Sequence, residues 1–586
     1  MSPPTTQSSS QTVSLSVPRP RKVRRMIKAD ETPSFFVALL FGFQQVMVCV
    51  SALLVIPFLL SDMLCAGQQV NMLRVQLISS TFVASGIGTL IQTSLGMRLA
   101  LLQGTAFAYV PSVQAFMNLP SNLCNATSSD FVPEHVYHEK LQLILGSLLL
   151  SSLVPMIIGC SGLVGLLTKF IGPITVSPLI LLLMASSVEM CVLRMQKHWV
   201  SLIQAAALFT TVLYLAELRV PIPGRKNGKF HVYRVNVFGQ YPYLIAILIS
   251  WGFCWLLTVS DAVAPESEAR VDKNATIAAI HDSPWFRVPL PGQFGLPRFN
   301  AGLFFAFLVS ALTSVFESVG DYHAIARVSE ERSPPSHAVN RGILAEGMGS
   351  FVSGLIGPGV GLTTHTENIG VIGITRVASR ATMLVAGVML ILLGLCTKLG
   401  AVLSTIPDPL VGGVLASSMA MVGGVAIANV QAVDLKNSRN MAILGFALMI
   451  GLIVPNYFSK HPNVGTGTPK DYRTIIIIRI ADWSGIDQIL HVLMSMPMFV
   501  GAFTACILDN TVPGATRTQR GLRERGMHHD LGPEGRDIYE WPTWMMRLIE
   551  RMPTLRYLPI VPRVKSAPNQ VHTMIENGDV VVDKTS

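Results

Sequence analysis

Two carboxylates lie four residues apart in a long apolar run of this chain. Glu317 and Asp321 come near the end of LFFAFLVSALTSVFESVGDY, with no basic residue between Arg298 and Arg327. On a helix this spacing puts both acids on one face, about one turn apart. An acid in the apolar part of a membrane costs about 3 kcal/mol or more, so the pair predicts a substrate or ion path.

A third acid, Glu367, lies where the helical pattern breaks. Residues 357–376 read GPGVGLTTHTENIGVIGITR, which is rich in glycine and threonine. In a membrane, backbone that is not helical must be buried in protein or line a cavity, because lipid offers no hydrogen-bond partner. The glycines let backbone amides approach a ligand, and a helix that restarts near Asn368 points its first amides at the cavity. We therefore expect Glu367 to line a binding site and His365 to be a packed or hydrogen-bonded residue.

A second broken segment, residues 105–118, reads TAFAYVPSVQAFMN. Pro111 argues against one continuous helix there. Thr105 and Ala106 offer an approach lined by small residues, and Phe107 follows with a ring that can stack on a flat ligand. We expect this segment to face the first one.

Composition places the chain among membrane proteins. It has 586 residues, of which 50% are hydrophobic and 13% charged, whereas a soluble domain has about 25% charged residues. The net charge of +10 is explained by cytoplasmic loop anchors, so we expect no nucleic-acid partner. The eight cysteines include no CxxC pair, so neither a zinc site nor a redox motif is indicated.

Apolar runs long enough to cross ~30 Å of hydrocarbon recur along the chain. They lie at 35–60, 76–96, 142–160, 174–192, 198–217, 241–260, 300–320, 343–357, 381–403, 410–428, 440–456 and 488–508. With the two broken segments they give about fourteen crossings, in which the broken segments are third and tenth. This matching placement predicts an all-α polytopic membrane fold of 7+7 inverted repeats, with the two short extended segments meeting at the site.

The distribution of charge predicts which side of the membrane each loop occupies. Residues 1–34 run from a Ser/Thr/Pro-rich stretch, expected to be disordered, into a basic cluster that ends at Lys28. With this N-terminus in the cytoplasm, the basic loop 217–240 and the C-terminal tail also fall inside, as the positive-inside rule requires. Arg194 and Lys197 land outside, against this trend.

Features of the outer loops agree with this topology. The glycosylation sequons at Asn125 and Asn274 both fall outside, as they must if they are used. Cys65 and Cys124 share the outer face, which allows a disulfide between them. We therefore expect a multi-pass glycoprotein of the plasma membrane whose two termini are cytoplasmic.

A series of motifs resembles the nucleobase–ascorbate transporter family, of the nucleobase:cation symporter-2 type. The family signature is Gln, Glu or Pro, then Asn-x-Gly, four residues, and Thr-Arg or Thr-Lys; Glu367-Asn368-Ile369-Gly370 followed by Thr375-Arg376 matches it in full. Further likeness lies in ESVGDY at 317–322, PWFRVPLPGQFGLP at 284–297, HAVNRG at 337–342, IPDPLVGG at 406–413, DLKNSRN at 434–440, GLIVPNY at 451–457 and ILDNTVPG at 507–514. The resemblance extends in order over about residues 33 to 515.

The resemblance implies a core domain, a gate domain and a homodimer, with a small-molecule substrate and membrane lipid as partners. The implied division is a cytoplasmic N-terminus at 1–34, core parts at 35–172 and 300–405, gate parts at 173–299 and 406–515, and a cytoplasmic tail at 516–586.

The resemblance also implies roles for individual residues. Glu317 corresponds to the family's eighth-span acid that hydrogen-bonds a nucleobase, and Glu367 to its partner in the tenth segment. Asp321 corresponds to the residue tied to cation coupling. Asn368 corresponds to the signature asparagine that supports the site, and Thr366 contributes backbone beside it.

The third segment and the first span are compared in the same way. Ala106 and Phe107 correspond to the family's backbone and aromatic contacts with the ligand. Many members carry Gln-His in the first span, where this chain has Gln44-Gln45. A role of that histidine in proton coupling or substrate orientation is therefore not expected here, and the two amides either cap a neighbour or line the site.

Charge helps to choose the substrate. Ascorbate is an anion at neutral pH. The resemblance implies that ascorbate transporters of the family carry Pro at the first signature position, where this chain has Glu367. Glu317 and Glu367 would repel an anion at a cost of several kcal/mol in a pocket of low dielectric constant. A neutral base presents N–H donors to such acceptors, so we expect uptake of a uracil-like or purine base.

The resemblance to animal-type members implies coupling to sodium rather than to protons, with Asp321 as the carrier in either case and no other cofactor. One sodium ion crossing ~100 mV gains ~2.3 kcal/mol and a tenfold gradient adds ~1.4 kcal/mol, enough for roughly 500-fold accumulation. The expected mechanism is an elevator, in which the core slides against the gate.

The alternative functions are a sodium-dependent ascorbate symporter, a channel or anion exchanger, and a transport-inactive receptor or scaffold. No nucleophile–base pair or metal-ligand spacing indicates an enzyme.

Overall fold

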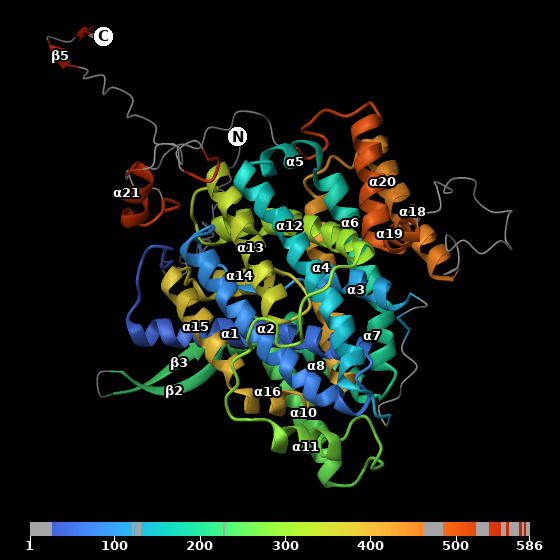
Figure 1. Ribbon diagram of the computed structural model, residues 1–586. Helices are drawn as coiled ribbons and strands as arrows, with labels where there is room; N and C mark the ends of the chain where they lie inside the picture. Colours follow the sequence, from blue (N-terminus) through green and yellow to red (C-terminus); the bar gives the residue numbers. More distant parts are fainter. Residues whose placement is uncertain are drawn as a thin grey trace, which may run out of the picture.

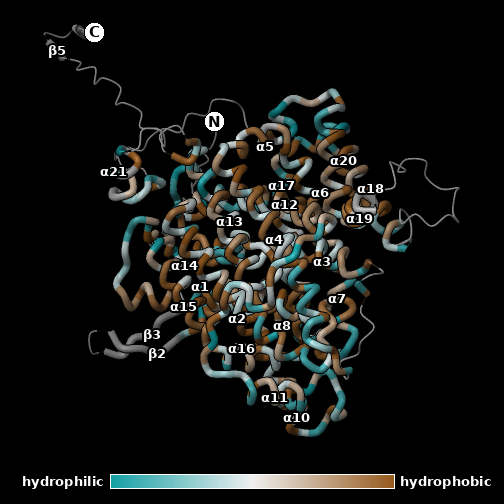
Figure 2. The backbone as a smooth tube through the Cα atoms, viewed as in Figure 1, coloured by the Kyte–Doolittle hydropathy of each residue, from teal (hydrophilic) through white to brown (hydrophobic). Residues whose placement is uncertain are grey.

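The computed structural model describes residues 26–119, 122–123, 130–226, 229–460, 484–522, 538–551, 558–561, 574–576 and 579–581. Helices dominate, because a helix pairs its own backbone groups where lipid offers no partner. Within these ranges, 8 helices are long and apolar enough to cross a membrane, judged by length and composition. Figure 2 shows hydrophobic residues along most helices and hydrophilic residues gathered in many of the connecting loops. The expected polytopic helical fold is confirmed.

The elements of the first half, in chain order, are shown in Figure 1. They are α1 (Phe35–Met63), η1 (Gly67–Gln69), α2 (Val70–Ser94), β1 (Gln103–Thr105), η2 (Phe107–Tyr109), α3 (Val110–Met117), α4 (Glu134–Ser161), α5 (Val164–Phe170), α6 (Pro173–Ser186), α7 (Val188–Met195), α8 (Val200–Phe209), η3 (Thr210–Tyr214), β2 (Val220–Lys226), β3 (Lys229–Val235), α9 (Val237–Gln240), α10 (Pro242–Val259) and α11 (Asn274–Asp282).

The second half begins at the helix that carries the acid pair. Its elements are α12 (Ala301–Val328), α13 (Ser336–Ile356), β4 (Leu362–Thr364), α14 (Thr366–Thr375), α15 (Arg380–Leu395), α16 (Thr397–Leu403), α17 (Asp408–Val430), α18 (Ser438–Lys460), α19 (Ser484–Met494), α20 (Pro497–Thr511), α21 (Thr543–Arg551), β5 (Met574–Glu576) and β6 (Asp579–Val581).

Some expected spans are divided in the structure. The run 174–192 is split into α6 and α7 near Ser187, and 488–508 into α19 and α20 at Pro497. Proline lacks the N–H that a continuing helix needs but fits the first turn of a new one, which explains the second break. The loop 217–240, expected only to be basic, contains an antiparallel β2–β3 hairpin.

The two broken segments meet as predicted. β1 and β4 form an antiparallel pair in which Gln103 faces Thr364, Gly104 faces Thr363 and Thr105 faces Leu362. η2 and α3 follow β1, and α14 follows β4, so each segment is a short strand followed by a short helix. The pairing satisfies backbone groups that lipid would leave without partners.

Contacts divide the helices into two groups. In the first, α2 packs against α13 and α15, α4 against α12 and α13, and α1 against α15. In the second, α17 packs against α6, α7 and α8, α20 against α6 and α18, and α10 against α8. Two helices of the first group also contact the second: α1 contacts α10 and α17, and α12 contacts α19, which packs against α18 and α20. Figure 1 shows α18 and α20 at the upper right, away from α1 and α15.

Residues near the start of the described chain and in the C-terminal tail pack against the first group. Ile27 pairs with Val377, so the last part of the stretch 1–34 is ordered, although disorder was expected for its beginning. Near the other end, the Tyr539 hydroxyl donates to the Arg332 carbonyl at 2.6 Å, and the Trp541 indole donates to the Leu95 carbonyl at 2.8 Å. Residues 1–25 lie outside the described residues.

Glycine is required where the broken segments meet. A Cβ on Gly104 would lie 2.4 Å from Cδ2 of His365. A Cβ on Gly361 would lie 2.5 Å from Cζ of Tyr109. Both neighbours are ring atoms of buried side chains, so neither can move aside easily.

We predict that Gly104→Ala lowers the free energy of unfolding by about 1–3 kcal/mol, because the added methyl group overpacks this contact. The measurement is the apparent melting temperature of the detergent-solubilised protein. Gly252→Ala in α10 is the matched control, since its Cβ meets nothing within 4 Å. Equal melting temperatures for the two variants would contradict the prediction.

Candidate functional site

The candidate site is framed by the ends of two short helices. The Ala106 amide donates to the Gly361 carbonyl at 2.9 Å, and the His365 amide donates to the Leu102 carbonyl at 2.9 Å. These bonds extend the β1–β4 pair at both ends and hold the starts of η2–α3 and α14 beside it. The first turn of a helix leaves backbone N–H groups without helix partners, so this junction offers donors to a ligand.

Glu367 lies in the first turn of α14 and is joined to a histidine. Nδ1 of His365 is 2.7 Å from Oε2 of Glu367, and their side chains are 5% and 18% exposed. His365 is thus a packed residue in ion-pair contact with the signature acid. The pair leaves the second carboxylate oxygen of Glu367 available to a ligand.

The acid pair of α12 faces the same junction, because α12 packs against β4 and α14. Asp321 is buried, and its Oδ2 accepts a hydrogen bond from the Thr366 hydroxyl at 3.0 Å. About one turn earlier in α12, the hydroxyls of Ser318 and Thr363 are 3.0 Å apart. Glu317 is partly exposed and makes no ion pair to lysine or arginine among the described residues.

A fourth acid, Glu346 of α13, was missed by the sequence analysis. It is buried, and its Oε1 accepts from the Tyr322 hydroxyl at 2.9 Å and from the Thr364 hydroxyl at 2.8 Å. The Gln92 amide donates to the Tyr322 hydroxyl at 2.8 Å, which ties α2 to this network. The signal was present, since Glu346 lies within the apolar run 343–357 as Glu317 lies within its own.

The first span contributes through Gln45. The Asn368 amide donates to the Gln45 carbonyl at 2.8 Å and to Gln45 Oε1 at 2.7 Å. Gln45 therefore caps a neighbour, one of the two roles that the sequence left open. Gln44 is buried, and its amide nitrogen has no protein hydrogen-bond partner in the structure.

The third segment places its predicted residues at the junction. Ala106 is fully buried, and Phe107, the first residue of η2, is half-buried. Thr105 is buried, and its hydroxyl has no protein partner in the structure. A half-buried ring beside unpaired donors suits a flat polar ligand.

The charge of the junction is strongly one-sided. Four acids lie around it: Glu346 and Asp321 accept from Thr364 and Thr366. Glu367 is in the first turn of α14, and Glu317 lies about one helical turn before Asp321. Among the described residues, the one ion pair to any of these four acids comes from His365. Within the same ranges, no group of three or more His, Cys, Asp or Glu side chains is arranged to hold a metal ion.

The predicted outer features lie on a different part of the molecule. Cys65 is disulfide-bonded, whereas its expected partner Cys124 lies outside the described residues. Asn274 is exposed and begins α11, and Asn125 lies outside the described residues.

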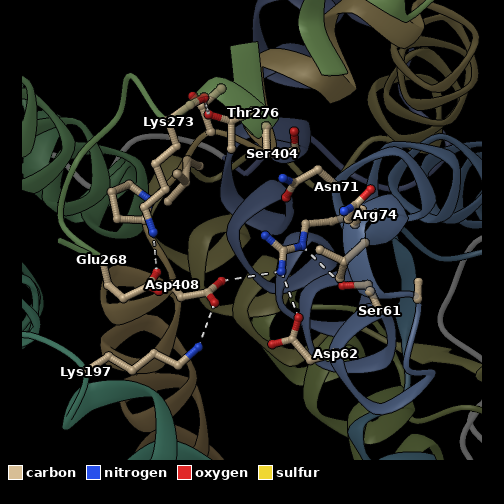
Figure 3. Close-up of a pocket in the computed structure, with 18 of the residues that line it drawn as sticks. Ser61, Asp62, Asn71, Arg74, Lys197, Glu268, Lys273, Thr276, Ser404 and Asp408 are labelled. Atoms are coloured by element: carbon tan, nitrogen blue, oxygen red, sulfur yellow. Dashed lines mark hydrogen bonds and ion pairs between the residues drawn. The ribbon is translucent and has the colours of Figure 1, made fainter. Parts of the chain in front are cut away.

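A cavity of about 440 Å³ opens near these outer features, away from the broken segments. Figure 3 shows charged side chains around it, among them Asp62, Arg74, Lys197 and Asp408. The cavity contains none of the predicted site residues.

Comparison with known proteins assigns the chain to a family. The model of a permease family (Xan_ur_permease) matches residues 36–460. Solute carrier family 23 member 2 of Homo sapiens is 34% identical over 561 residues, which cover 93% of this chain and 83% of that protein. Nucleobase-ascorbate transporter 11 of Arabidopsis thaliana is 28% identical over 559 residues, which cover 89% of this chain and 74% of that protein. The chain belongs to the nucleobase–ascorbate transporter family. It is therefore a multi-pass membrane transporter and not an enzyme, as predicted.

Other members of the nucleobase–ascorbate transporter family match over a similar length. Solute carrier family 23 member 1 of Mus musculus is 35% identical over 566 residues, covering 93% of this chain and 90% of that protein. Among solved structures, the transmembrane domain of the cyanobacterium bicarbonate transporter BicA aligns with a TM-score of 0.44 and 12% identity, covering 69% of this chain and 98% of that chain. A structural likeness at that level carries no argument about the substrate.

We predict that Tyr322→Phe lowers the free energy of unfolding by about 1–3 kcal/mol, because it leaves the buried Gln92 amide without its acceptor. The apparent melting temperature of the purified protein measures the change. Tyr214→Phe is the control, since Tyr214 is 81% exposed and loses no buried partner. The network has no stabilising role if both variants melt with the wild type.

Proposed function

We propose that this transporter takes up a neutral nucleobase, coupled to a cation, and binds it where the two broken segments meet. The observation that carries the proposal is the convergence of Glu317, Asp321, Glu346 and Glu367 on this junction, with His365 as their single ion-pair partner among the described residues. An uncharged ligand with N–H donors suits such acceptors, and an added cation offsets their charge.

The groups around the junction match the two kinds of polar edge on a nucleobase. Glu317 and the second oxygen of Glu367 accept from ring N–H groups. The first amides of η2 and α14 donate to ring carbonyl oxygens. Phe107 stacks on the flat face of the ring. The carboxylates alone would oppose an anionic ligand, because like charges in a region of low dielectric constant repel strongly.

The excess of acidic over basic side chains at the junction also supports coupling to a cation. Bringing several acids together within a membrane costs free energy unless cations or protons accompany them. Asp321 is buried and accepts a hydrogen bond from Thr366 of α14. A cation bound at Asp321 would therefore link ion binding to the geometry of the proposed ligand site. We propose sodium as the cation, with a proton as the alternative, and the plasma membrane as the location, with both termini cytoplasmic.

The transport motion we propose is an elevator. The first helix group, with the site between its broken segments, is the core, and the second group is the gate. The packing of most helices within one group or the other supports this division, and α1 and α12 make the contacts between the groups. The exposed apolar face of α18, which includes Phe446 and Ile453, is available to lipid or to the gate of a second copy in a homodimer.

Sodium-dependent ascorbate transport is the second candidate, favoured by one observation. A protonated His365, 2.7 Å from Glu367, would cancel the charge of the signature acid. The start of α14 would then present its amides and partial positive charge to an anion. Three acids still oppose that anion, so we place the neutral base first.

We predict that cells expressing the chain accumulate labelled uracil, xanthine or hypoxanthine, and that Glu317→Gln and Glu367→Gln each reduce this uptake at least tenfold. Losing a hydrogen bond to a charged acceptor costs about 1.5–3 kcal/mol, which is roughly ten- to hundredfold. The measurement is initial uptake at equal surface expression. Glu189→Gln, at an exposed position on α7, is the control. Uptake of ascorbate alone, without competition by any base, would overturn the proposal in favour of the second candidate.

We predict that Asp321→Asn abolishes the stimulation of uptake by sodium while equilibrium binding of the base is reduced less. The comparison is uptake in sodium against uptake in choline, together with the shift in melting temperature on adding the base. Asp282→Asn, on an exposed carboxylate of α11, should keep full stimulation. Equal uptake in both salts by the wild type, combined with a steep dependence on external pH, would assign the coupling to protons.

A further inference from the structure

Four charged side chains form a closed ring where the two helix groups touch on the outer side. Asp62 of α1 lies 2.8 Å from Arg74 of α2 and 2.6 Å from Arg194 of α7. Asp408, the first residue of α17, lies 3.5 Å from the same Arg74 and 3.3 Å from the same Arg194. Each arginine thus contacts both acids, and positive and negative charges alternate around the ring. Lys197 extends it with a contact of 2.9 Å to Asp408.

Three of the four side chains of the ring are largely shielded from solvent, and the ring is anchored to α1. The side chains of Arg74, Arg194 and Asp408 are 7%, 6% and 13% exposed, whereas that of Asp62 is 34% exposed. Arg194 also donates to the Phe58 carbonyl at 2.9 Å, and the Arg74 guanidinium lies 4.1 Å from the centre of the Phe58 ring. Such buried charges persist because each has opposite charges and hydrogen bonds around it.

The ring lies between the outer cavity and a region of apolar packing. Asp62, Arg74, Lys197 and Asp408 line the outer cavity of about 440 Å³ (Figure 3). On the inner side, α1 meets α10 and α17 along an apolar seam. The side chains that line a small void in this seam include Leu54, Val55, Ile247, Val411 and Val414. The route between the helix groups is therefore closed first by charge and then by apolar packing.

Each helix group contributes one acid and one arginine to the ring, so the groups can separate without breaking every ion pair. Asp62 and Arg74 belong to the first helix group, and Arg194, Lys197 and Asp408 to the second. If the groups separate, two ion pairs break, Arg194 to Asp62 and Arg74 to Asp408, together with the hydrogen bond from Arg194 to the Phe58 carbonyl. Each acid and each arginine keeps one partner on its own side. No charge is then left buried and alone, which is the costly outcome when a buried ion pair is broken.

We propose that this ring is the outer gate of the transporter: closed, it seals the route to the site from the outer cavity, and it splits into two self-paired halves when the core moves away from the gate. The inference rests on the proposed division of the chain into a moving core and a gate. It does not depend on the identity of the substrate.

The test measures access to the seam below the ring. Val411, 4% exposed, is replaced by cysteine, and a membrane-impermeant thiol reagent is applied to intact cells from outside. Labelling should be slow with an intact ring. Adding Asp62→Asn or Arg194→Gln should speed it about fivefold or more. In the double variant the increase should be smaller than the product of the two single increases, because both changes remove the shared contact between Asp62 and Arg194.

Two variants serve as controls for the position of the charge. Lys197→Gln removes a contact that lies wholly within the second group, so labelling should change much less than with Arg194→Gln. Asp261→Asn removes a contact to Arg270 on the outer loop, outside the ring, and should leave labelling unchanged. Unchanged labelling in both ring variants overturns the gate, and so does an equal increase with Asp261→Asn.

A variant that fails to reach the surface is replaced by Arg194→Lys, which keeps the charge but lacks the fork that reaches Asp62, Asp408 and the Phe58 carbonyl together. It should label at an intermediate rate, and labelling at the rate of the intact ring counts against the gate. The labelling requires no substrate. A chain that transports no nucleobase but shows ring-dependent labelling therefore refutes the proposed function alone, whereas nucleobase uptake with ring-independent labelling refutes the gate alone.

Discussion

The pairing of β1 with β4 is the constraint on which the rest of the structure depends. Both segments leave the helical conformation inside a bundle that lies in lipid, where an unpaired backbone group costs several kcal/mol. The pairing of Gln103 with Thr364 and of Thr105 with Leu362 gives these backbone groups hydrogen-bond partners and so avoids that cost. It also fixes where η2–α3 and α14 begin, and so brings their free amides to one place. The close approach of Gly104 to His365 is a consequence of this pairing, and it puts the signature acid, Glu367, beside a histidine.

The remaining spans reach the junction through side chains of the signature segment. Thr366 bonds Asp321 of α12, and Asn368 bonds Gln45 of α1. Thr364 bonds Glu346 of α13. The start of α14 is thus tied to three helices by hydrogen bonds that replace lost water contacts. A ligand or ion bound at the junction would therefore act on hydrogen bonds that reach α1, α12 and α13.

Much of this arrangement was predictable from the sequence. Glycine, threonine and proline mark the two broken segments, and acids in apolar runs mark the site, because both patterns are costly in lipid. Partners separated by hundreds of residues were not predictable. Nothing local indicates that Gln45 caps Asn368 or that Glu346 joins Tyr322, since these contacts depend on how the spans pack. Arg194 and Lys197 illustrate the same limit. In the predicted topology they run against the positive-inside trend, and in the structure each lies beside an acid of the ring.

The two charged clusters differ in balance, and the difference separates their roles. In the outer ring, Arg74, Arg194 and Lys197 match Asp62 and Asp408 closely enough that every acid has a basic partner. Such a cluster is complete without a ligand, so its work is to hold two surfaces together and release them. At the inner junction, four acids share one histidine among the described residues. Uncompensated charge is costly in a membrane, so this imbalance would be relieved by a cation, a proton or hydrogen-bond donors beside the acids, which is the physical basis of the proposed cation-coupled binding.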